Sequence, residues 1–162
     1  MGTAESRTMV SSPVTAPARM PGKQSEPRAG CGAAIVVDGR ILLLRRLTDP
    51  EAGSWGLAGG KIDLFETAEA AMRREVGEEL GIVVGTVALL CFVDQIDVAA
   101  GTHWVAPIYR VLSFTGTPRN CEPAKHDGPV WYPLDALPPN LTTPTRAAVA
   151  ALARSAEGAV PA

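Results

Sequence analysis

The sequence is poor in several features that would each indicate a class of protein. Aromatic residues make up 5% of the 162 residues, and the formal net charge is only -2. Such a small charge gives no electrostatic reason to expect nucleic-acid binding. No apolar run approaches the length of a membrane span, and the N-terminus lacks the unbroken apolar core of a signal peptide. We therefore expect a cytoplasmic protein whose partners include neither nucleic acid nor a membrane.

Cysteine is also scarce. The three cysteines are odd in number, lie far apart and form no Cys-x-x-Cys pair; they are Cys31, Cys91 and Cys121. This pattern argues against a disulfide framework and against a cysteine zinc site. We expect reduced thiols that pack as small apolar side chains.

Length and composition favour a single folded domain. A hydrophobic content of 46% over 162 residues is enough for one full core. Residues 1–28 are rich in Pro, Ser, Thr, Ala and Gly, so burial cannot offset their ordering entropy, and we expect a disordered tail. The folded domain is predicted for residues 29–157, and residues 158–162 are expected to fray.

Strand signals occur on both sides of a short acidic segment. Asp38 and Gly39 separate two apolar runs, which is typical of a β-hairpin. The strands are predicted at 33–37, 41–44, 55–60, 83–93, 102–114 and 130–133, with a polar link over 94–101. Pro107 predicts an edge position or a bulge. Thr143 is predicted to cap a last helix that runs to about Ser155, with Pro144 at its first position.

The acidic segment, GKIDLFETAEAAMRREVGEELGI, spans residues 60–82. Thr67 as N-cap and Gly81 as a left-handed stop predict a helix from Ala68 to Leu80. At roughly 100° per residue, three glutamates gather in one sector, beside an apolar stripe. The glutamates are Glu75, Glu78 and Glu79, and the stripe is Ala68, Met72, Val76 and Leu80.

Carboxylates on adjoining helical turns repel one another unless a cation lies among them. Mg²⁺ is commonly held by a few carboxylates together with substrate phosphates. The cluster therefore indicates a phosphate-handling Mg²⁺ site. The alternative is a solvated acidic face, with Arg73 and Arg74 as ordinary ion-pair partners.

The spacing of this segment resembles the Nudix box of the Nudix hydrolases. The matching positions are Gly60, Glu66, Arg74, Glu75, Gly77, Glu78, Glu79 and Gly81, with apolar residues at 76, 80 and 82. The resemblance extends over about 31–154 and is nearest to MutT-like members that cleave nucleoside triphosphates. It implies an α/β fold, in which a mixed β-sheet lies between helices as an α/β/α sandwich.

The resemblance also assigns roles to residues. It implies that Glu75, Glu78, Glu79 and the carbonyl of Gly59 bind the divalent metal, which is Mg²⁺ with Mn²⁺ as a substitute. One of these glutamates would accept the proton of the attacking water. The matching roles of Arg74 and Glu66 are to orient the glutamates and to support the preceding loop. Glu122 and Asp127 are candidates for one further acidic ligand.

The loop before the helix departs from the family pattern. Members of the family commonly have Glu and then Gly before the glutamate that matches Glu66. This chain has Asp63, Leu64 and Phe65 there. Asp63 keeps the negative charge, but Phe65 replaces a conformationally permissive glycine.

Substrate contacts are predicted at Arg45, Lys61, Trp55 and His103, and Arg46 follows Arg45 at the same strand end. A cationic side chain there can reach phosphates, although a solvated strand end is the simpler interpretation. A single histidine flanked by Thr102 and Trp104 is more often structural than catalytic. The aromatic candidates for base stacking are Trp55, His103, Trp104 and Trp131.

These features lead to one predicted function and two alternatives. We expect a small-molecule nucleotide substrate, a nucleoside triphosphate that is cleaved to the monophosphate and pyrophosphate. The alternatives are a nucleoside diphosphate sugar such as ADP-ribose, and a Nudix-like module that senses a nucleotide without catalysis. The sequence leaves the oligomeric state open. The resemblance makes a homodimer a candidate, since related enzymes are often dimers, and the apolar strand around Trp104 is a candidate contact.

Overall fold

The structure, a computed structural model, describes residues 26–49 and 51–157. The predicted tail therefore lies almost wholly outside the described residues, as does the frayed end at 158–162. Within the described ranges there are two helices, α1 (Ala68–Leu80) and α2 (Thr143–Glu157). The strands are β1 (Arg28–Val37), β2 (Arg40–Arg46), β3 (Trp55–Gly56), β4 (Ala58–Lys61), β5 (Val83–Val84), β6 (Val87–Asp97), β7 (Thr102–Val111), β8 (Phe114–Thr115) and β9 (His126–Pro133).

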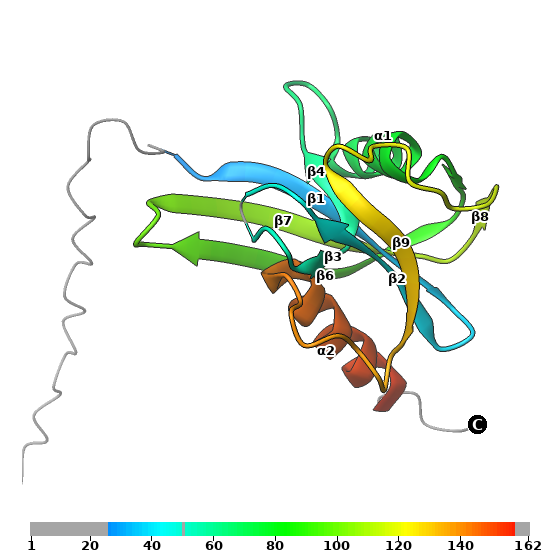
Figure 1. The fold of residues 1–162 in the computed structure, drawn as a ribbon. Helices are drawn as coiled ribbons and strands as arrows, with labels where there is room; N and C mark the ends of the chain where they lie inside the picture. Colours follow the sequence, from blue (N-terminus) through cyan, green and yellow to red (C-terminus); the bar gives the residue numbers. More distant parts are fainter. Residues whose placement is uncertain (1–25, 50, 158–162) are drawn as a thin grey trace, which may run out of the picture.

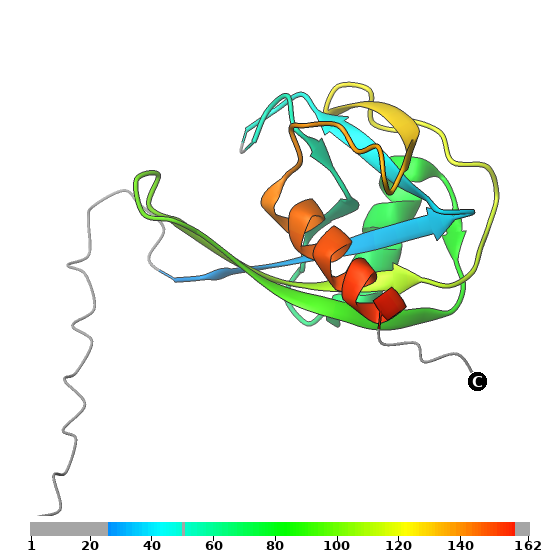
Figure 2. The same cartoon turned by 90° about the horizontal axis from the view of Figure 1, so that it is seen from below.

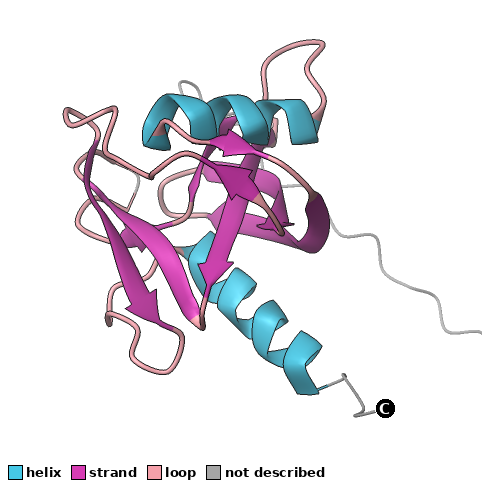
Figure 3. Ribbon diagram, turned by 90° about the vertical axis from the view of Figure 1, so that its right-hand side faces the viewer, coloured by secondary structure: helices cyan, strands magenta, loops and turns pink. Residues whose placement is uncertain are grey.

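The elements form three layers. Helix α1 covers one face of the main sheet and α2 covers the other (Figure 1 and Figure 3). The main path of the sheet is β3-β2-β1-β7-β6, with β4 paired to β1 and β9 paired to β2. Strands β1 and β7 run parallel, whereas the other pairs in this sheet are antiparallel. The predicted α/β/α sandwich around a mixed sheet is thus confirmed.

Strand β1 connects the sheet to the acidic segment because it changes partner along its length. Its first half pairs with β4 from Gly30 to Ala33, and its end pairs with β2 at Val36 and Val37. The turn to β2 has positive φ at Asp38 and Gly39. A two-residue turn with these φ values has a twist that matches the right-handed twist of the two strands. The predicted hairpin is confirmed, and β1 begins at Arg28, one residue before the predicted domain.

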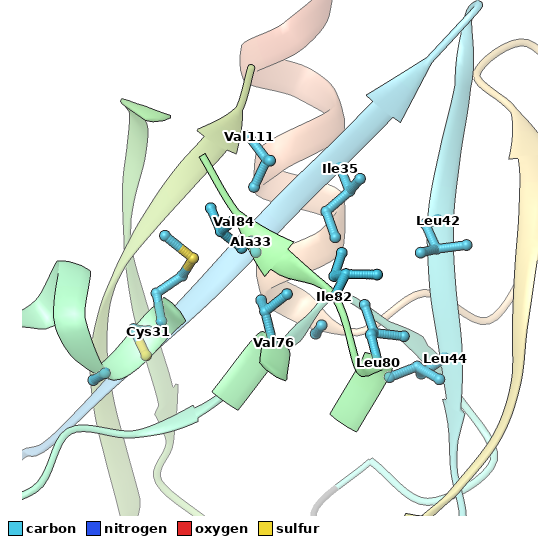
Figure 4. Close-up of a cluster of buried hydrophobic side chains, with 13 residues drawn as sticks. Cys31, Ala33, Ile35, Leu42, Leu44, Val76, Leu80, Ile82, Val84 and Val111 are labelled. Carbon is cyan, nitrogen blue, oxygen red and sulfur yellow. The ribbon is translucent and has the colours of Figure 1, made fainter. Parts of the chain in front are cut away.

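A buried apolar cluster joins α1 to the sheet. Ile35 from β1, Leu44 from β2, Val76 and Leu80 from α1, and Val111 from β7 meet in it (Figure 4). On the opposite face, α2 packs Ala148 and Leu152 against two smaller clusters. The buried apolar side chains of α1 therefore fix its position on the sheet, and these side chains alternate along the helix with its glutamates.

The β6–β7 hairpin extends beyond the layers (Figure 2). Strand β6 continues to Asp97, so the link is shorter than the predicted span of 94–101. The edge position predicted from Pro107 is wrong, because β7 lies between β1 and β6. Pro107 pairs with Phe92 close to a register shift in β6, so its missing N–H coincides with a local irregularity.

Helix α2 begins one residue differently from the prediction. Thr142 is the N-cap. Its Oγ1 accepts a hydrogen bond from the Thr145 backbone N–H at 3.4 Å, and its carbonyl accepts one from the Arg146 backbone N–H at 3.0 Å. Thr143 is already helical, and its backbone N–H donates to Oε1 of Glu51 at 2.9 Å. A distant side chain, which no local pattern reveals, therefore decides between the two threonines.

The outer strand β6 exposes Leu89, Phe92 and Ile96, and Val98 follows it in the turn. An unpaired edge with apolar side chains is the part of the described sheet best suited to association. The homodimer remains a prediction. Neither described helix is long and apolar enough to cross a membrane.

We expect Ile35→Ala to destabilise the fold by about 2–5 kcal/mol, because Ile35 is only 1% exposed and truncation leaves a cavity between α1 and the sheet. Denaturant unfolding measures this change. Val98→Ala is the control, since Val98 is 83% exposed and should change stability by less than about 0.5 kcal/mol. Equal losses in the two variants would contradict the assigned core.

Candidate functional site

The acidic segment forms the predicted helix from Ala68 to Leu80, with both predicted caps. Oγ1 of Thr67 accepts a hydrogen bond from the Ala70 backbone N–H at 3.2 Å, and Gly81 adopts the left-handed conformation at φ 67°. In the predicted apolar stripe Met72, Val76 and Leu80 are buried, while Ala68 is half-buried. Burial of this stripe orients the adjoining row of carboxylates.

Arg74 lies at the centre of the cluster. Its Nε and Nη2 donate to Oε1 and Oε2 of Glu66 at 3.0 and 2.9 Å, a bidentate pair. Its Nη1 donates to Glu75 at 2.8 Å and to Glu78 at 3.3 Å, and its Nη2 also donates to the Lys61 carbonyl at 3.2 Å. One guanidinium thus holds three carboxylates and the end of β4.

The charges in this group shift one another's protonation. The hydrogen bonds from Arg74 hold the pKa of Glu66 below its usual range. The bonds to Glu66 and then Glu75 raise the pKa of Arg74. Glu66 is therefore ionised at neutral pH and fixes the guanidinium that faces Glu75 and Glu78.

Glu79 differs from its neighbours because it is buried, at 5% exposure. Its Oε2 accepts a hydrogen bond from the Gly59 backbone N–H at 2.9 Å. Burial raises the pKa of Glu79 to about 8, with a smaller contribution from the charge of Glu75, while the Gly59 bond opposes the rise. Sequence spacing alone places Glu79 with the other glutamates and does not reveal that it faces the sheet.

Two glycines in β4 allow the carboxylates to approach the backbone. A Cβ on Gly60 would lie 2.4–2.6 Å from the carboxylate atoms of Glu75. A Cβ on Gly59, which has φ 149°, would lie 2.2 Å from the Cys31 carbonyl oxygen. Glycine is therefore required at position 59, where the contacts are with backbone atoms, whereas a side chain at position 60 would displace the Glu75 carboxylate.

The loop residue that departs from the Nudix pattern adopts a glycine-like conformation. Phe65 has φ 68° and is 97% exposed, so its side chain makes no compensating burial. The Asp63 backbone N–H donates to Oε2 of Glu66 at 3.3 Å, and the Glu66 N–H donates to the Asp63 carbonyl at 3.1 Å. The loop closes at the cost of a strained phenylalanine.

A second group of ligand atoms adjoins Glu79. Glu122 lies in the turn before β9 and His126 begins β9, and the two are one turn apart, because the His126 backbone N–H donates to the Glu122 carbonyl at 3.1 Å. One ligand atom from each of Glu79, Glu122 and His126 lies within 4.8 Å of the others. Burial, followed by the charge of Arg46, lowers the pKa of His126.

A pocket of about 210 Å³ opens on the same side of the sheet as the N-terminus of α2. Its lining combines Arg46, Gly59, Gly60 and Lys61 with Glu51, Gln95 and Trp104. Nε2 of Gln95 donates to Oε2 of Glu51 at 3.1 Å. The guanidinium carbon of Arg28 lies 5.6 Å from the centre of the Trp104 ring. The pocket joins the glycine pair to an aromatic side chain.

Of the predicted substrate contacts, Lys61 lines this pocket, whereas Arg45, Trp55 and His103 do not. Arg45 donates to the Gly53 carbonyl at 3.4 Å, and Trp55 packs edge-on against Tyr132. Nε2 of His103 lies 3.4 Å from Oδ1 of Asp94 on the extended hairpin.

Several residues of the site were not selected from the sequence. Glu51 and Gln95 are 44 positions apart, and no spacing rule joins them. His126 carries a signal only in retrospect, four residues after Glu122. Asp127, the other candidate acidic ligand, is exposed and lies outside the group of Glu79, Glu122 and His126.

Comparison with known proteins agrees with this geometry. A family model for the NUDIX domain matches residues 26–152. The crystal structure of a MutT NUDIX hydrolase from Burkholderia pseudomallei is 54% identical, with a TM-score of 0.78. That comparison covers 79% of this chain and 99% of the other. The similarity thus extends over the whole sandwich.

Curated relatives match over shorter stretches. An "Oxidized purine nucleoside triphosphate hydrolase" of Danio rerio is 30% identical over 104 residues, which cover 64% of this chain and 65% of that protein. An "ADP-ribose pyrophosphatase" of Methanocaldococcus jannaschii is 36% identical over 83 residues, which cover 51% and 49%. The match thus covers from about half to about two thirds of the length of these relatives.

Replacing the strained loop residue should stabilise the protein. We expect Phe65→Gly to raise the free energy of unfolding by about 0.5–1 kcal/mol, because the relief of a left-handed phenylalanine exceeds the entropic cost of glycine. The matched control is Leu64→Gly, which relieves no positive φ and should lower stability. Denaturant unfolding of both variants is the measurement, and a loss of stability in Phe65→Gly would contradict the assigned strain.

The three thiols should differ in alkylation. Burial raises the pKa of Cys31 to about 11, so at pH 8 roughly one molecule in a thousand carries its thiolate. Cys121 is exposed and should react first with iodoacetamide. The rate at Cys31 should rise as pH increases toward 11, and peptide mapping by mass spectrometry follows both sites. Equal rates at pH 8 would contradict the burial of Cys31.

Proposed function

Because the chain belongs to the Nudix domain family, we propose that it is a divalent-metal-dependent pyrophosphohydrolase that cleaves a nucleoside triphosphate to the monophosphate and pyrophosphate. The observation that carries this proposal is the network of Arg74 with Glu66, Glu75 and Glu78 beside the buried Glu79. Arg74 balances only part of the negative charge of the carboxylates that it contacts, and the remainder is available for a metal ion to neutralise.

The residues fit a hard divalent ion. Glu75, Glu78 and Glu79 together with the Gly59 carbonyl would supply oxygen ligands, the kind that Mg²⁺ and Mn²⁺ take. The bound ion would neutralise phosphate charge and lower the pKa of a water ligand. We propose Mg²⁺, with Mn²⁺ as a substitute.

The protein's own groups have separable roles in this proposal. Arg74 keeps Glu75 and Glu78 on one side of α1, so their carboxylates are preorganised. Lys61 and Arg46, which line the pocket, bind phosphate oxygens. A glutamate of α1 accepts the proton of the attacking water at its carboxylate.

The rest of the pocket suits a nucleoside. Trp104 offers an aromatic face for stacking, and the Glu51–Gln95 pair offers polar groups to the edge of a base. Since the pocket also contains Gly59 and Gly60, a nucleoside bound there has its phosphates directed to the carboxylates.

ADP-ribose is the second candidate substrate, because one relative is named an ADP-ribose pyrophosphatase. Cleavage would then give AMP and ribose phosphate rather than pyrophosphate. A nucleotide sensor without catalysis is the third candidate, and the intact set of Arg74 and three α1 glutamates disfavours it.

Two further expectations are kept as proposals. All three cysteines are free, which is compatible with a reducing compartment, and we propose the cytoplasm. We also propose a homodimer that uses the exposed edge of β6.

Glu78→Gln should lower kcat by at least about 100-fold, because it removes a proposed metal ligand and its charge. Among the described residues, the Glu78 carboxylate is hydrogen-bonded to Arg74 alone, and its side chain is 52% exposed, so stability should be preserved. The matched control is Glu69→Gln on the same helix, whose carboxylate pairs with Arg73. The measurement is Mg²⁺-dependent turnover of a panel of nucleoside triphosphates, with pyrophosphate and monophosphate quantified separately.

Release of orthophosphate, or turnover of ADP-ribose alone, would contradict the proposed bond and substrate. Unchanged turnover in Glu78→Gln would contradict the assigned site. If neither substrate class is hydrolysed but nucleotide binding is measured by calorimetry, the sensor interpretation replaces the enzyme.

A further inference from the structure

One side chain joins three segments at the polar end of the pocket. Oε1 of Glu51 accepts hydrogen bonds from the backbone N–H and the Oγ1 of Thr143 at 2.9 and 3.1 Å. Its Oε2 accepts a hydrogen bond from Nε2 of Gln95 at 3.1 Å. Glu51 thus connects its own loop to the N-terminus of α2 and to strand β6, and each of these segments lines the pocket.

Glu51 holds this position with an unusual backbone conformation. Its φ is 62°, in the left-handed region that residues other than glycine rarely adopt. The Ser54 backbone N–H donates to the Glu51 carbonyl at 3.1 Å, which closes the turn around the strained residue. Such strain persists only where the surrounding structure demands it, and it is concentrated at ligand sites. It is therefore a second reason to assign Glu51 a role beyond the fold.

The Glu51 carboxylate also fixes the direction of the Gln95 amide. A carboxylate only accepts hydrogen bonds, so the group that faces it must be the NH₂ of Gln95 and not the carbonyl. Oε1 of Gln95 has no hydrogen-bond partner among the described residues. This end of the pocket therefore presents two acceptors, Oε1 of Gln95 and Oε2 of Glu51, beside one remaining amide N–H.

Trp104 would place a base against these acceptors. Gln95 of β6 and Trp104 of β7 are direct cross-strand partners, so their side chains leave the sheet on the same face. Both side chains line the pocket. A base that stacks on the Trp104 indole therefore has one edge within reach of the Gln95 amide.

We propose that Gln95, positioned by Glu51, selects nucleobases that carry an exocyclic amino group over those that carry only oxo groups, such as hypoxanthine and uracil. An amino group donates to the two acceptors, whereas an oxo group would face a carbonyl and a carboxylate and leave both unpaired. Gln95 is the contacting residue, and Glu51 is a positioning residue that acts through it. The inference rests on the nucleotide substrate of the proposed function but not on hydrolysis.

The test measures binding of nucleoside monophosphates to the full chain by isothermal titration. These nucleotides contain no phosphoric anhydride bond, so recognition is measured separately from hydrolysis. We expect IMP, whose base has no amino group, to bind at least about 10-fold more weakly than the better of AMP and GMP. UMP should bind more weakly than CMP by a similar factor.

Glu51→Gln is the diagnostic variant. A second carboxamide can pair with Gln95 in either direction, so the Gln95 amide is no longer fixed, and the preference for amino-bearing bases should fall below about threefold. Gln95→Leu should give the same loss because it removes the acceptor, and it keeps the test decisive if Glu51→Gln does not fold. A purely structural role of Glu51 would instead weaken binding of all five nucleotides equally, which would contradict the proposal.

The matched control is Arg146→Ala, which should keep the base preference of the wild-type protein. Nη2 of Arg146 donates to Oγ1 of Thr143 at 3.0 Å, so this variant loosens the same turn of α2. The Arg146 side chain is exposed and does not line the pocket.

Three results would overturn the proposal. They are wild-type protein that binds IMP as tightly as AMP and GMP, a base preference that survives in both pocket variants, and failure of all five nucleotides to bind. Turnover of nucleoside triphosphates without base preference would contradict this inference and leave the proposed function intact. Selective binding without turnover would do the reverse.

Discussion

The hydrogen bond from the Gly59 backbone N–H to Glu79 is the contact on which the site depends. It lets a carboxylate lie buried between α1 and β4, where burial alone would strongly disfavour its ionised form. The bond requires β4 to approach the helix closely, and Gly60 meets Glu75 in the same gap. The position of α1 against the sheet therefore depends on the glycine pair in β4.

The features that depend on residues close together in the sequence, namely the helix caps and the hairpin turn, were predicted correctly. Thr67 and Gly81 mark the ends of α1 because caps act within one turn, and Asp38-Gly39 marks its hairpin because few residues adopt positive φ. The mixed sheet between two helices followed from the resemblance rather than from any one pattern. The side-chain roles assigned through it remain predictions for experiment.

The parts that depend on long-range contacts could not be predicted. The backbone N–H of Thr143 donates to Glu51, 92 positions away, and the N-cap is Thr142, one residue before the predicted one. Pro107 predicted an edge position or a bulge, and the structure fits the second alternative, because Pro107 lies on an inner strand opposite Phe92, close to a register shift in β6. Arg45, Trp55 and His103 do not line the pocket, and their contacts with a substrate remain predictions.

Charge balance explains why these elements meet where they do. Arg74 lies within ion-pair distance of four carboxylates, those of Glu66, Glu75, Glu78 and, at 3.8 Å, Asp63, so this group alone carries three more negative charges than positive ones. Such an excess of negative charge beside α1 would repel a phosphate. It would also destabilise α1, unless a dication bound together with the substrate. Because the apolar stripe of α1 fixes the helix regardless, the carboxylates cannot relax apart. The packing of the core thus keeps these negative charges close together, and this supports the proposal that a divalent cation binds among them.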